Sequence, residues 1–378
     1  MWMLFYDVPL FLAMIIAYAI GFVALMLLAG LIAPKVARRL TNKFSLYTSM
    51  YLAGFIAVFT GVAGLALISI ALADVLGTIV TAAFIIGLAL FILIINVFSY
   101  LFSPLMINLA YRATPDNQLQ EIVNRVAGKA GFKKPPKAVV VRGPPNAFAY
   151  GNPIFGKYVA VSSEMLRITN REELEAVIGH ELGHHKHRDN AIMLFMGIFP
   201  SIIYYLGVML IRLGIISGAS RLSRDRRSNG GVFFILIGIA AVILSFIVQI
   251  LVLAFSRLRE YYADAHGAKV SSPRNMQRAL AKLHLYYEYN DVGYERLSNS
   301  KLKALFIYAL SEAFANPFYH YIPPPRDFNV DVDQAIEELK KKEESGFKEI
   351  MSTHPPIPKR LRFLDYVGYR PVKVEEYV

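Results

Sequence analysis

The chain has 378 residues, of which 55% are hydrophobic and only 18% are charged, a balance that predicts a membrane protein rather than a soluble globular one. It contains no cysteine, so disulfides and thiolate metal sites are excluded, and only histidine or carboxylate side chains are left to hold a metal ion. The formal net charge of +12 is spread over several loops. Because no nucleic-acid-binding motif accompanies it, this charge indicates attraction to anionic lipid headgroups, and no nucleic-acid partner is expected.

Residues 1–109 are expected to form an N-terminal membrane region. They contain three apolar runs, each long enough to cross a bilayer core, which takes about 20 helical residues. The runs cover residues 9–33, 51–72 and 78–99. A basic loop, 34–43, follows the first run, and the positive-inside rule predicts that it is cytoplasmic. The segment that follows the third run is then cytoplasmic as well.

Residues 110–190 have the composition of a soluble domain and are expected to begin the catalytic part. Three short β-rich segments, 137–142, 146–151 and 157–162, are separated by turn residues and predict a small antiparallel sheet. A helix is predicted next over 172–187. Thr169 or Asn170 is the expected N-cap, because their side-chain oxygens accept hydrogen bonds from the first free amides of a helix.

The sequence His180-Glu181-Leu182-Gly183-His184 is an H-E-x-x-H pattern within this predicted helix. Helix geometry puts His180 and His184 on one face, where both imidazoles can bind one zinc ion. Glu181 projects to the side of that face and is the expected general base that activates water at the metal. A polar surface helix that is simply rich in histidine would also match the pattern, so a third ligand decides between the two interpretations.

Two further apolar segments, at about 191–216 and 232–255, bring the expected number of spans to five. They lie in a predicted region 191–255 and are joined by a basic loop, 217–231. Two spans return the chain to the side that it left, yet this basic loop would then lie outside, against the positive-inside tendency. Either these segments do not cross fully or other loops set the orientation. Residues 256–378 are expected to complete the catalytic part.

The third ligand is expected directly after the fifth span. Glu260 and Asp264 are four residues apart and therefore share a helical face. In a two-histidine, one-glutamate site, Glu260 would bind the metal and Asp264 would accept the free ring N–H of a ligating histidine. The alternative is that both are ordinary juxtamembrane charges, pairing along the helix with Arg257 and Arg259.

These motifs together resemble the HtpX-type membrane zinc metalloproteases of peptidase family M48, which are related to the CAAX prenyl endopeptidases. The resemblance rests on His180-Glu181-x-x-His184, two apolar spans and a following Ser256-Arg257-x-x-Glu260-x-x-x-Asp264 pattern, and it covers about residue 110 to the end. With the five spans expected from the apolar runs, it implies a mainly α, polytopic membrane protein. To these spans it adds a cytoplasmic, zincin-like (gluzincin) α+β catalytic domain with a small antiparallel sheet.

The resemblance also implies roles for two further segments. Asn146, Ala147, Phe148 and Ala149 are similar to the family's edge strand, which pairs with an extended peptide substrate. The late segment that contains His354, followed by Arg360, is similar to a motif whose histidine and arginine stabilise the transition state. From the residues alone, the first segment also reads as a core strand and His354 as a loop residue before a Pro-Pro turn.

The function expected from the sequence is a membrane-anchored zinc endopeptidase, with one Zn²⁺ per chain, that cleaves membrane or misfolded proteins at the cytoplasmic face of the cell membrane in quality control. Its expected partners are peptide or protein substrates and the lipid bilayer, and the sequence does not indicate an oligomeric state. Two alternatives stay open: a CAAX prenyl-protein endopeptidase, and a non-enzymatic membrane scaffold with a structural metal site. Asp189 is expected to cap or anchor the fourth span.

Overall fold

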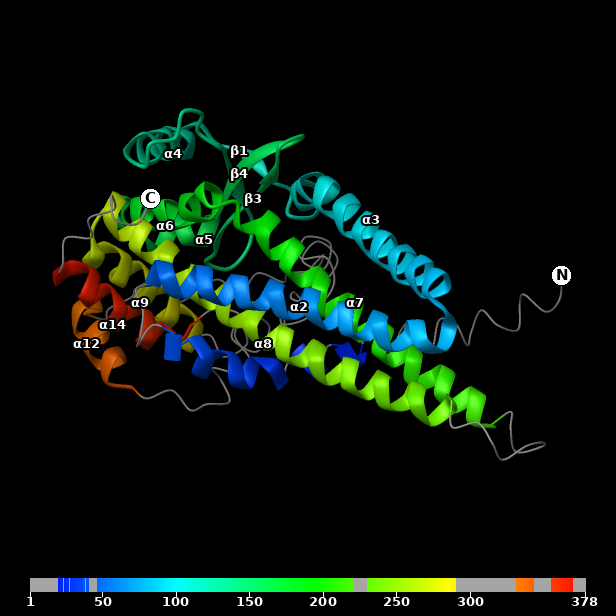
Figure 1. Ribbon diagram of the computed structural model, residues 1–378. Coiled ribbons are helices and arrows are strands. Elements are labelled where there is room, and N and C mark those ends of the chain that lie inside the picture. Colours follow the sequence, from blue (N-terminus) through cyan, green and yellow to red (C-terminus); the bar gives the residue numbers. More distant parts are fainter. Residues whose placement is uncertain are drawn as a thin grey trace. The chain divides into compact units, whose positions relative to one another are not determined.

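The computed structural model describes residues 20–22, 24–26, 28–37, 39–40, 46–219, 230–289, 331–342 and 355–369. Within these ranges the chain is mainly helical and has one four-stranded sheet (Figure 1). The chain divides into two compact units. One comprises Met1–Leu40, Tyr51–Val97 and Met193–Phe255, and the other comprises Thr41–Met50, Phe98–Ile192 and Ser256–Val378. We call them the apolar unit and the catalytic unit.

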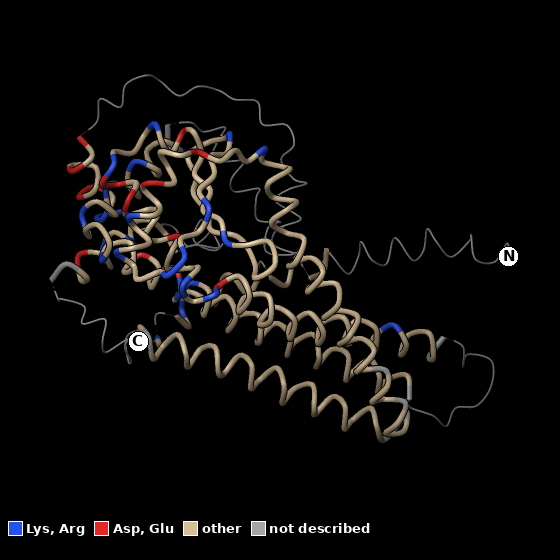
Figure 2. Tube along the Cα trace, turned by 90° about the horizontal axis from the view of Figure 1, so that it is seen from above, with Lys and Arg blue, Asp and Glu red and all other residues tan. Residues whose placement is uncertain are grey.

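Five helices in the described residues are long and apolar enough to cross a membrane, as the sequence predicted. Four of them have labels in Figure 1, namely α2 (Leu46–Leu76), α3 (Thr78–Ala110), α7 (Asp189–Ala219) and α8 (Gly230–Val270). An unlabelled helix with a candidate span at Ile20–Ala37 precedes them. Figure 2 shows long helical stretches that are almost free of charged residues. The prediction of a polytopic, mainly α protein is therefore confirmed.

Helices α7 and α8 approach each other closely within the apolar unit because glycines face each other at the contact. A β-carbon added at Gly207 would lie 2.8 Å from the carbonyl oxygen of Gly238, and one added at Gly238 would lie 2.6 Å from that of Gly207. Small residues at such positions let the backbones of membrane helices pack directly against each other. Larger side chains at either glycine would push the two helices apart.

The catalytic unit contains a sheet with the strand order β1-β2-β4-β3. Its strands are β1 (Thr114–Pro115), β2 (Lys137–Val141), β3 (Ala147–Asn152) and β4 (Gly156–Ser162). β3 and β4 form an antiparallel hairpin, whereas β2 pairs with β4 in parallel. The expectation of a purely antiparallel sheet was therefore wrong.

The physical reason for the parallel pair is burial. The apolar runs of β2 and β4 are largely buried, so both strands take central positions, whereas the first residues of β3 stay partly exposed. β3 reverses the chain direction between them, so β2 and β4 point the same way. As a result, β3 lies at an edge of the sheet, and no other strand of the described residues pairs with its outer side.

Helices pack around this sheet and carry most of the functional side chains. They are α4 (Asn117–Lys129), α5 (Ser163–Ile168), α6 (Arg171–Lys186), α9 (Pro273–Tyr289), α12 (Val332–Lys341) and α14 (Ile357–Tyr369). The main core joins α4, the sheet, α6 and α9 through buried residues such as Val123, Val159 and Ile178. A second cluster joins α9, α12 and α14 through Leu280, Ile336 and Leu361 among others. These cores hold α6 on both sides.

Candidate metal centre and active site

Helix α6 begins with a complete capping box. The Asn170 side chain accepts a hydrogen bond from the Glu173 amide, and the Glu173 carboxylate accepts one from the Asn170 amide. Such caps satisfy amides that have no partner inside the helix and fix where it starts. The predicted N-cap is confirmed in Asn170, and this start point determines the helical face on which His180 and His184 project.

Two glycines in the signature helix allow α8 to come close. A β-carbon added at Gly179 would lie 3.1 Å from the Cα atom of Gly267, and one added at Gly183 would lie 3.3 Å from the Cα atom of Ala263. Gly267 of α8 is equally tight, because its added β-carbon would lie 2.6 Å from the Ala176 carbonyl oxygen. This near backbone contact places the polar end of α8 against the histidine face of α6.

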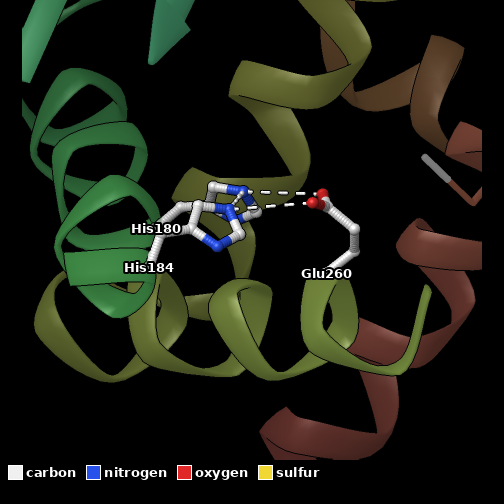
Figure 3. Close-up of side chains that lie close together, drawn as sticks. All are labelled: His180, His184 and Glu260. Carbon is white, nitrogen blue, oxygen red and sulfur yellow. Dashed lines mark hydrogen bonds and ion pairs between the residues drawn. The ribbon is translucent and has the colours of Figure 1, made fainter. Parts of the chain in front are cut away.

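Three side chains from these two helices converge (Figure 3). His180 and His184 point from α6 toward Glu260 on α8. The two histidine Nε2 atoms are 3.2 Å apart, and they lie 3.8 Å and 3.7 Å from the nearest Glu260 carboxylate oxygens. A tetrahedral ion with bonds of about 2.1 Å separates its ligand atoms by about 3.4 Å, so the three donors fit one small divalent cation.

A carboxylate holds the other ring nitrogen of each histidine. The Nδ1 atom of His180 lies 2.9 Å from Asp264 Oδ1, and Nδ1 of His184 lies 2.6 Å from Asp189 Oδ2. A carboxylate can only accept a hydrogen bond, so these contacts put the ring proton on Nδ1 and leave the Nε2 lone pair free for a metal.

The surroundings shift the pKa values of the two histidines in opposite directions. Burial lowers the pKa of His184 to about 4, so its imidazole is neutral near pH 7. Burial also opposes protonation of His180, but the hydrogen bond and the charge of Asp264 outweigh it and raise the pKa of His180. Both rings nevertheless direct Nε2 toward the Glu260 carboxylate.

Each of the two aspartates is paired with an arginine. Arg360, on α14, donates from Nε to Asp264 Oδ2 at 2.7 Å and from Nη2 to Oδ1 at 2.5 Å. Although burial opposes the charged form, the Asp264 carboxylate raises the pKa of Arg360. Arg259, on α8, forms an ion pair with Asp189 and also donates to its backbone carbonyl at 3.3 Å. In each case, a series of side-chain contacts leads from an arginine through an aspartate to a histidine.

Asp189 is the functional residue that sequence reasoning missed. The sequence gave it only a capping role at the fourth span, and it does lie in the first turn of α7. Its side chain, however, contacts His184, five residues earlier in the chain. The available signal was this short separation across a tight reversal, where Arg188 adopts a left-handed backbone with φ of 55°.

Glu181 faces the edge strand of the sheet. The amide of Ala149 in β3 donates to Glu181 Oε2 at 2.7 Å, and the Asn190 side chain donates to the Ala149 carbonyl at 3.3 Å. Ala149 therefore directs both backbone groups away from β4, toward the free side of the strand. The preceding Asn146 binds back to the sheet, because its amide and carbonyl pair with Ser162.

The remaining predicted site residues have three different outcomes. Ala147 and Phe148 lie in β3 with Ala149, so the proposed substrate segment is a real strand that begins one residue after Asn146. Arg360 is 7% exposed and bonded to Asp264, on the side of His180 away from Nε2. His354 lies outside the described residues.

Comparison with known proteins identifies the family to which the chain belongs. The model of peptidase family M48 matches residues 113–367. This chain belongs to that family. Relatives with the name protease HtpX homolog occur in Pyrobaculum aerophilum, 49% identical over 93% of this chain and 96% of the relative, and in Archaeoglobus fulgidus, 48% identical over 97% and 99%. A crystal structure of S. mikatae Ste24p is more distant, with 18% identity, a TM-score of 0.47 and coverage of 84% of this chain and 67% of that one.

Membership of family M48 makes the chain a membrane-anchored metalloprotease that acts on peptide or protein substrates. The family implies a metal, and the described residues offer His180, His184 and Glu260 as a group whose donor atoms all lie within 4.8 Å of one another. Their chemistry fits a divalent cation, since two neutral imidazoles and one carboxylate leave a bound 2+ ion with a net positive charge. Such an ion would act as a Lewis acid that polarises a carbonyl group or a water molecule.

Proposed function

We propose that this M48 protein is a zinc endopeptidase in which His180, His184 and Glu260 hold one Zn²⁺ ion. Nitrogen and carboxylate ligands in the absence of any cysteine suit zinc in the two-histidine, one-glutamate arrangement of catalytic sites. The observation that carries the proposal is the position of Glu181, which lies on the same helix between the two histidines and is not needed as a ligand. A purely structural site would have no use for a base there.

When bound, zinc would polarise the scissile carbonyl and lower the pKa of water. Glu181 accepts the proton of the attacking water and passes it to the leaving amine. Asp264 and Asp189 keep the two imidazoles in the Nδ1–H tautomer, and Arg360 holds Asp264 in place. His354 is proposed, on the resemblance alone, as the donor to the developing oxyanion.

The substrate is proposed to bind as an extended strand beside β3, along Asn146, Ala147, Phe148 and Ala149. Support comes from the free edge of β3 and from the outward backbone groups of Ala149. A peptide strand would replace the Asn190 side chain at the Ala149 carbonyl and the Glu181 carboxylate at its amide. Binding would thereby free Glu181 to act as base, and main-chain recognition would give broad specificity.

The proposed cellular role is quality control of membrane and misfolded proteins, with the catalytic domain in the cytoplasm. The basic loop 34–43 supports this orientation through the positive-inside rule. Proximity to the bilayer supports the substrate class, because Glu260 follows the apolar segment that ends at Phe255 by five residues of one continuous helix, about 7.5 Å. The proposed domain organisation is that given from the sequence, with 110–190 and 256–378 forming the catalytic part.

The test is zinc content and cleavage of an unfolded model protein by the purified chain and by Glu181→Gln. We expect one zinc per chain in both proteins and cleavage only by the unchanged chain, because the substitution removes the base and keeps the ligands. A chain without zinc would refute the metal proposal. Cleavage by Glu181→Gln at the unchanged rate would refute the role of Glu181. A prenylated peptide should compete no better than its unmodified form; stronger competition would favour the CAAX endopeptidase alternative.

A further inference from the structure

The turn between β3 and β4 is apolar and exposed, which is unusual for a hairpin tip. The turn consists of Pro153, Ile154 and Phe155, and we call these residues together with Gly156, the first residue of β4, the hairpin tip. Ile154 is 67% exposed and Phe155 is 37% exposed. Exposed turns of soluble domains are normally polar, so two large apolar side chains here need a partner other than water.

The hairpin tip is fixed to helix α3 by one buried side chain. Asn152 donates from its amide nitrogen to the carbonyls of Tyr100 and Leu101, at 2.9 Å and 2.8 Å. Pro104 lies inside α3 and has no N–H for the carbonyl four residues earlier, which is that of Tyr100. Two side chains replace the missing amide at the Tyr100 carbonyl, the Ser103 hydroxyl of α3 itself at 2.9 Å and the Asn152 amide from the hairpin.

The same Asn152 side chain also shapes the turn. Its oxygen accepts hydrogen bonds from the amides of Ile154 and Phe155, at 3.0 Å and 2.9 Å. Asn152 is 3% exposed. Its amide nitrogen donates to α3, and its amide oxygen accepts from the hairpin tip. These four hydrogen bonds tie the hairpin tip to α3.

Phe155 packs on the outward face of α3. The rings of Phe102 and Phe155 lie 6.2 Å apart, and those of Phe98 and Phe102 lie 4.4 Å apart. Phe98, Phe102, Leu105 and Leu109 recur at helical spacing and are each at least 36% exposed, so they form one apolar stripe. On a membrane-spanning helix such a stripe faces lipid, and the hairpin tip extends it.

The length of α3 indicates how deep the hairpin tip lies in the bilayer. Its candidate span, Thr81–Ala110, has 30 residues and is about 45 Å long, whereas the hydrocarbon core is about 30 Å thick. About ten residues must therefore lie beyond the core if the helix is upright. These residues are expected at the C-terminal end of α3, because Arg112 follows that end closely and is the first charged residue after Asp74. Phe102 and the hairpin tip then lie at the boundary between hydrocarbon and headgroups.

Lys157, an exposed cation next to the hairpin tip, donates from Nζ to the His185 carbonyl at 3.2 Å. Lys157 is the first residue after the hairpin tip, and Arg188 is close enough to act on it electrostatically. Burial, and then the charge of Arg188, lowers the pKa of Lys157. Lipid phosphates at the headgroup level would offset the repulsion between the two cations, which is the charge pattern expected of a surface that contacts anionic lipid.

We propose that the hairpin tip is an interfacial membrane anchor that presents the free edge of β3 to polypeptides tethered in the bilayer. Strand β3 runs from Asn152 at the anchor to Ala149 at Glu181, three residues or about 10 Å. A chain that emerges from the membrane therefore meets the edge strand at its membrane end and reaches the catalytic base within a few residues. This inference rests on the proposed function for its substrate, but not for the anchor itself.

The anchor is tested by fluorescence quenching in vesicles of phosphatidylcholine and phosphatidylglycerol. Trp2 is the only tryptophan of the chain, so Trp2→Phe gives a dark background for Ile154→Trp, and Tyr366→Trp, 73% exposed on α14, is the matched control. Doxyl labels near the headgroup should quench Ile154→Trp more strongly than labels deep in the acyl chains, and more strongly than they quench the control. Equal quenching of both variants would overturn the anchor.

Substrate selection is tested with Ile154→Asp and the conservative Ile154→Leu in the same vesicles. Ile154→Asp should lose most cleavage of a single-span protein cut close to the membrane and retain cleavage of soluble, unfolded casein, whereas Ile154→Leu should retain both. If Ile154→Asp retained cleavage of both substrates equally, or lost cleavage of both, the proposed role of the hairpin tip in substrate selection would be overturned. If the unchanged chain cleaves neither substrate, the proposed function fails, while the quenching result stands on its own.

Discussion

The two metal-facing histidines have the same kind of support, built in two different ways. His184 is held by Asp189, five residues away across a tight reversal of the chain, whereas His180 is held by Asp264 on another helix, which is in turn held by Arg360, 96 residues further on. Asp264 is fully buried and Asp189 is slightly exposed. Asp189 comes from the same stretch of chain as His184 and is paired with Arg259 of α8, whereas Asp264 and Arg360 both come from other helices than His180. Damage to the support of His180 should therefore be felt in folding as well as in metal binding.

The largest effect is expected for Asp264→Asn. The substitution leaves Arg360 as a buried cation without a counter-charge, which typically costs about 3 to 5 kcal/mol. It also removes the carboxylate that orients His180, which lowers metal affinity roughly 10- to 100-fold. Thermal unfolding in detergent and zinc titration measure the two effects.

The double variant Asp264→Asn/Arg360→Met is the matched control. Without either charge, no uncompensated ion is buried, so most of the lost stability should return while zinc affinity stays low. If stability and zinc affinity both returned, or if neither did, Arg360 would not act mainly on folding and Asp264 on both folding and metal binding.

Asp189→Asn should weaken zinc binding by a similar factor, roughly 10- to 100-fold, with a smaller loss of stability. Its partner Arg259 loses the carboxylate but keeps a hydrogen bond to the Asp189 backbone carbonyl, so part of this contact survives. The measurement is the same pair of titration and melting curves. A loss of stability equal to that of Asp264→Asn would contradict the contrast between the two supports.

Asn170→Ala tests stability in α6 without touching either support. Loss of an N-cap side chain typically costs about 1 kcal/mol. We expect a lower melting temperature and unchanged zinc stoichiometry, because the helix core and both aspartates remain. Asn170→Ser, which keeps a capping oxygen, should restore most of the stability. A change in zinc affinity with Asn170→Ala would mean that the cap also sets the ligand geometry.

The smallest effect is expected on the α4-facing side of α6, at Glu175. Burial would raise its pKa, but hydrogen bonds from Lys129 and Arg125 outweigh burial and lower it. A lowered folded-state pKa contributes stability above the unfolded value of about 4.3, and this contribution is lost as the pH falls through the folded pKa.

Glu175→Gln should therefore be less stable than the unchanged chain at pH 7, and the difference should shrink below about pH 4. Both cationic partners are partly exposed, so solvent weakens the interaction and the effect is small. Melting temperatures across a pH series measure it. A difference that grows as the pH falls would reverse the sign and refute the explanation.

Features set by short segments could be read from the sequence. The spans follow from apolar length, and the start of α6 follows from the Asn170–Glu173 capping box. Helical spacing alone places His180 and His184 on one face. The hairpin of β3 and β4 was also visible, since turn residues separate two β-rich runs.

Other features needed the tertiary structure. The sequence offered Glu260 and Asp264 only as one of two interpretations, because charge pairing along a helix explained them equally well. Their approach to His180 depends on glycines in α6 and α8 that let two backbones meet. The parallel pairing of β2 with β4 was missed because it depends on which strands are buried most deeply, a property of the whole core.

The sequence by itself determined the apolar helices, the signature helix and the chemical types of the ligands, because helix formation and membrane crossing depend on neighbouring residues. Only the tertiary structure decided which carboxylate supports which histidine, that Arg360 binds Asp264, and that Asn152 ties the hairpin tip to the proline break in α3. These contacts join residues from 5 to 96 positions apart in the chain. Their partners are chosen by packing and by the cost of leaving a buried polar group unpaired, which no local pattern of residues records.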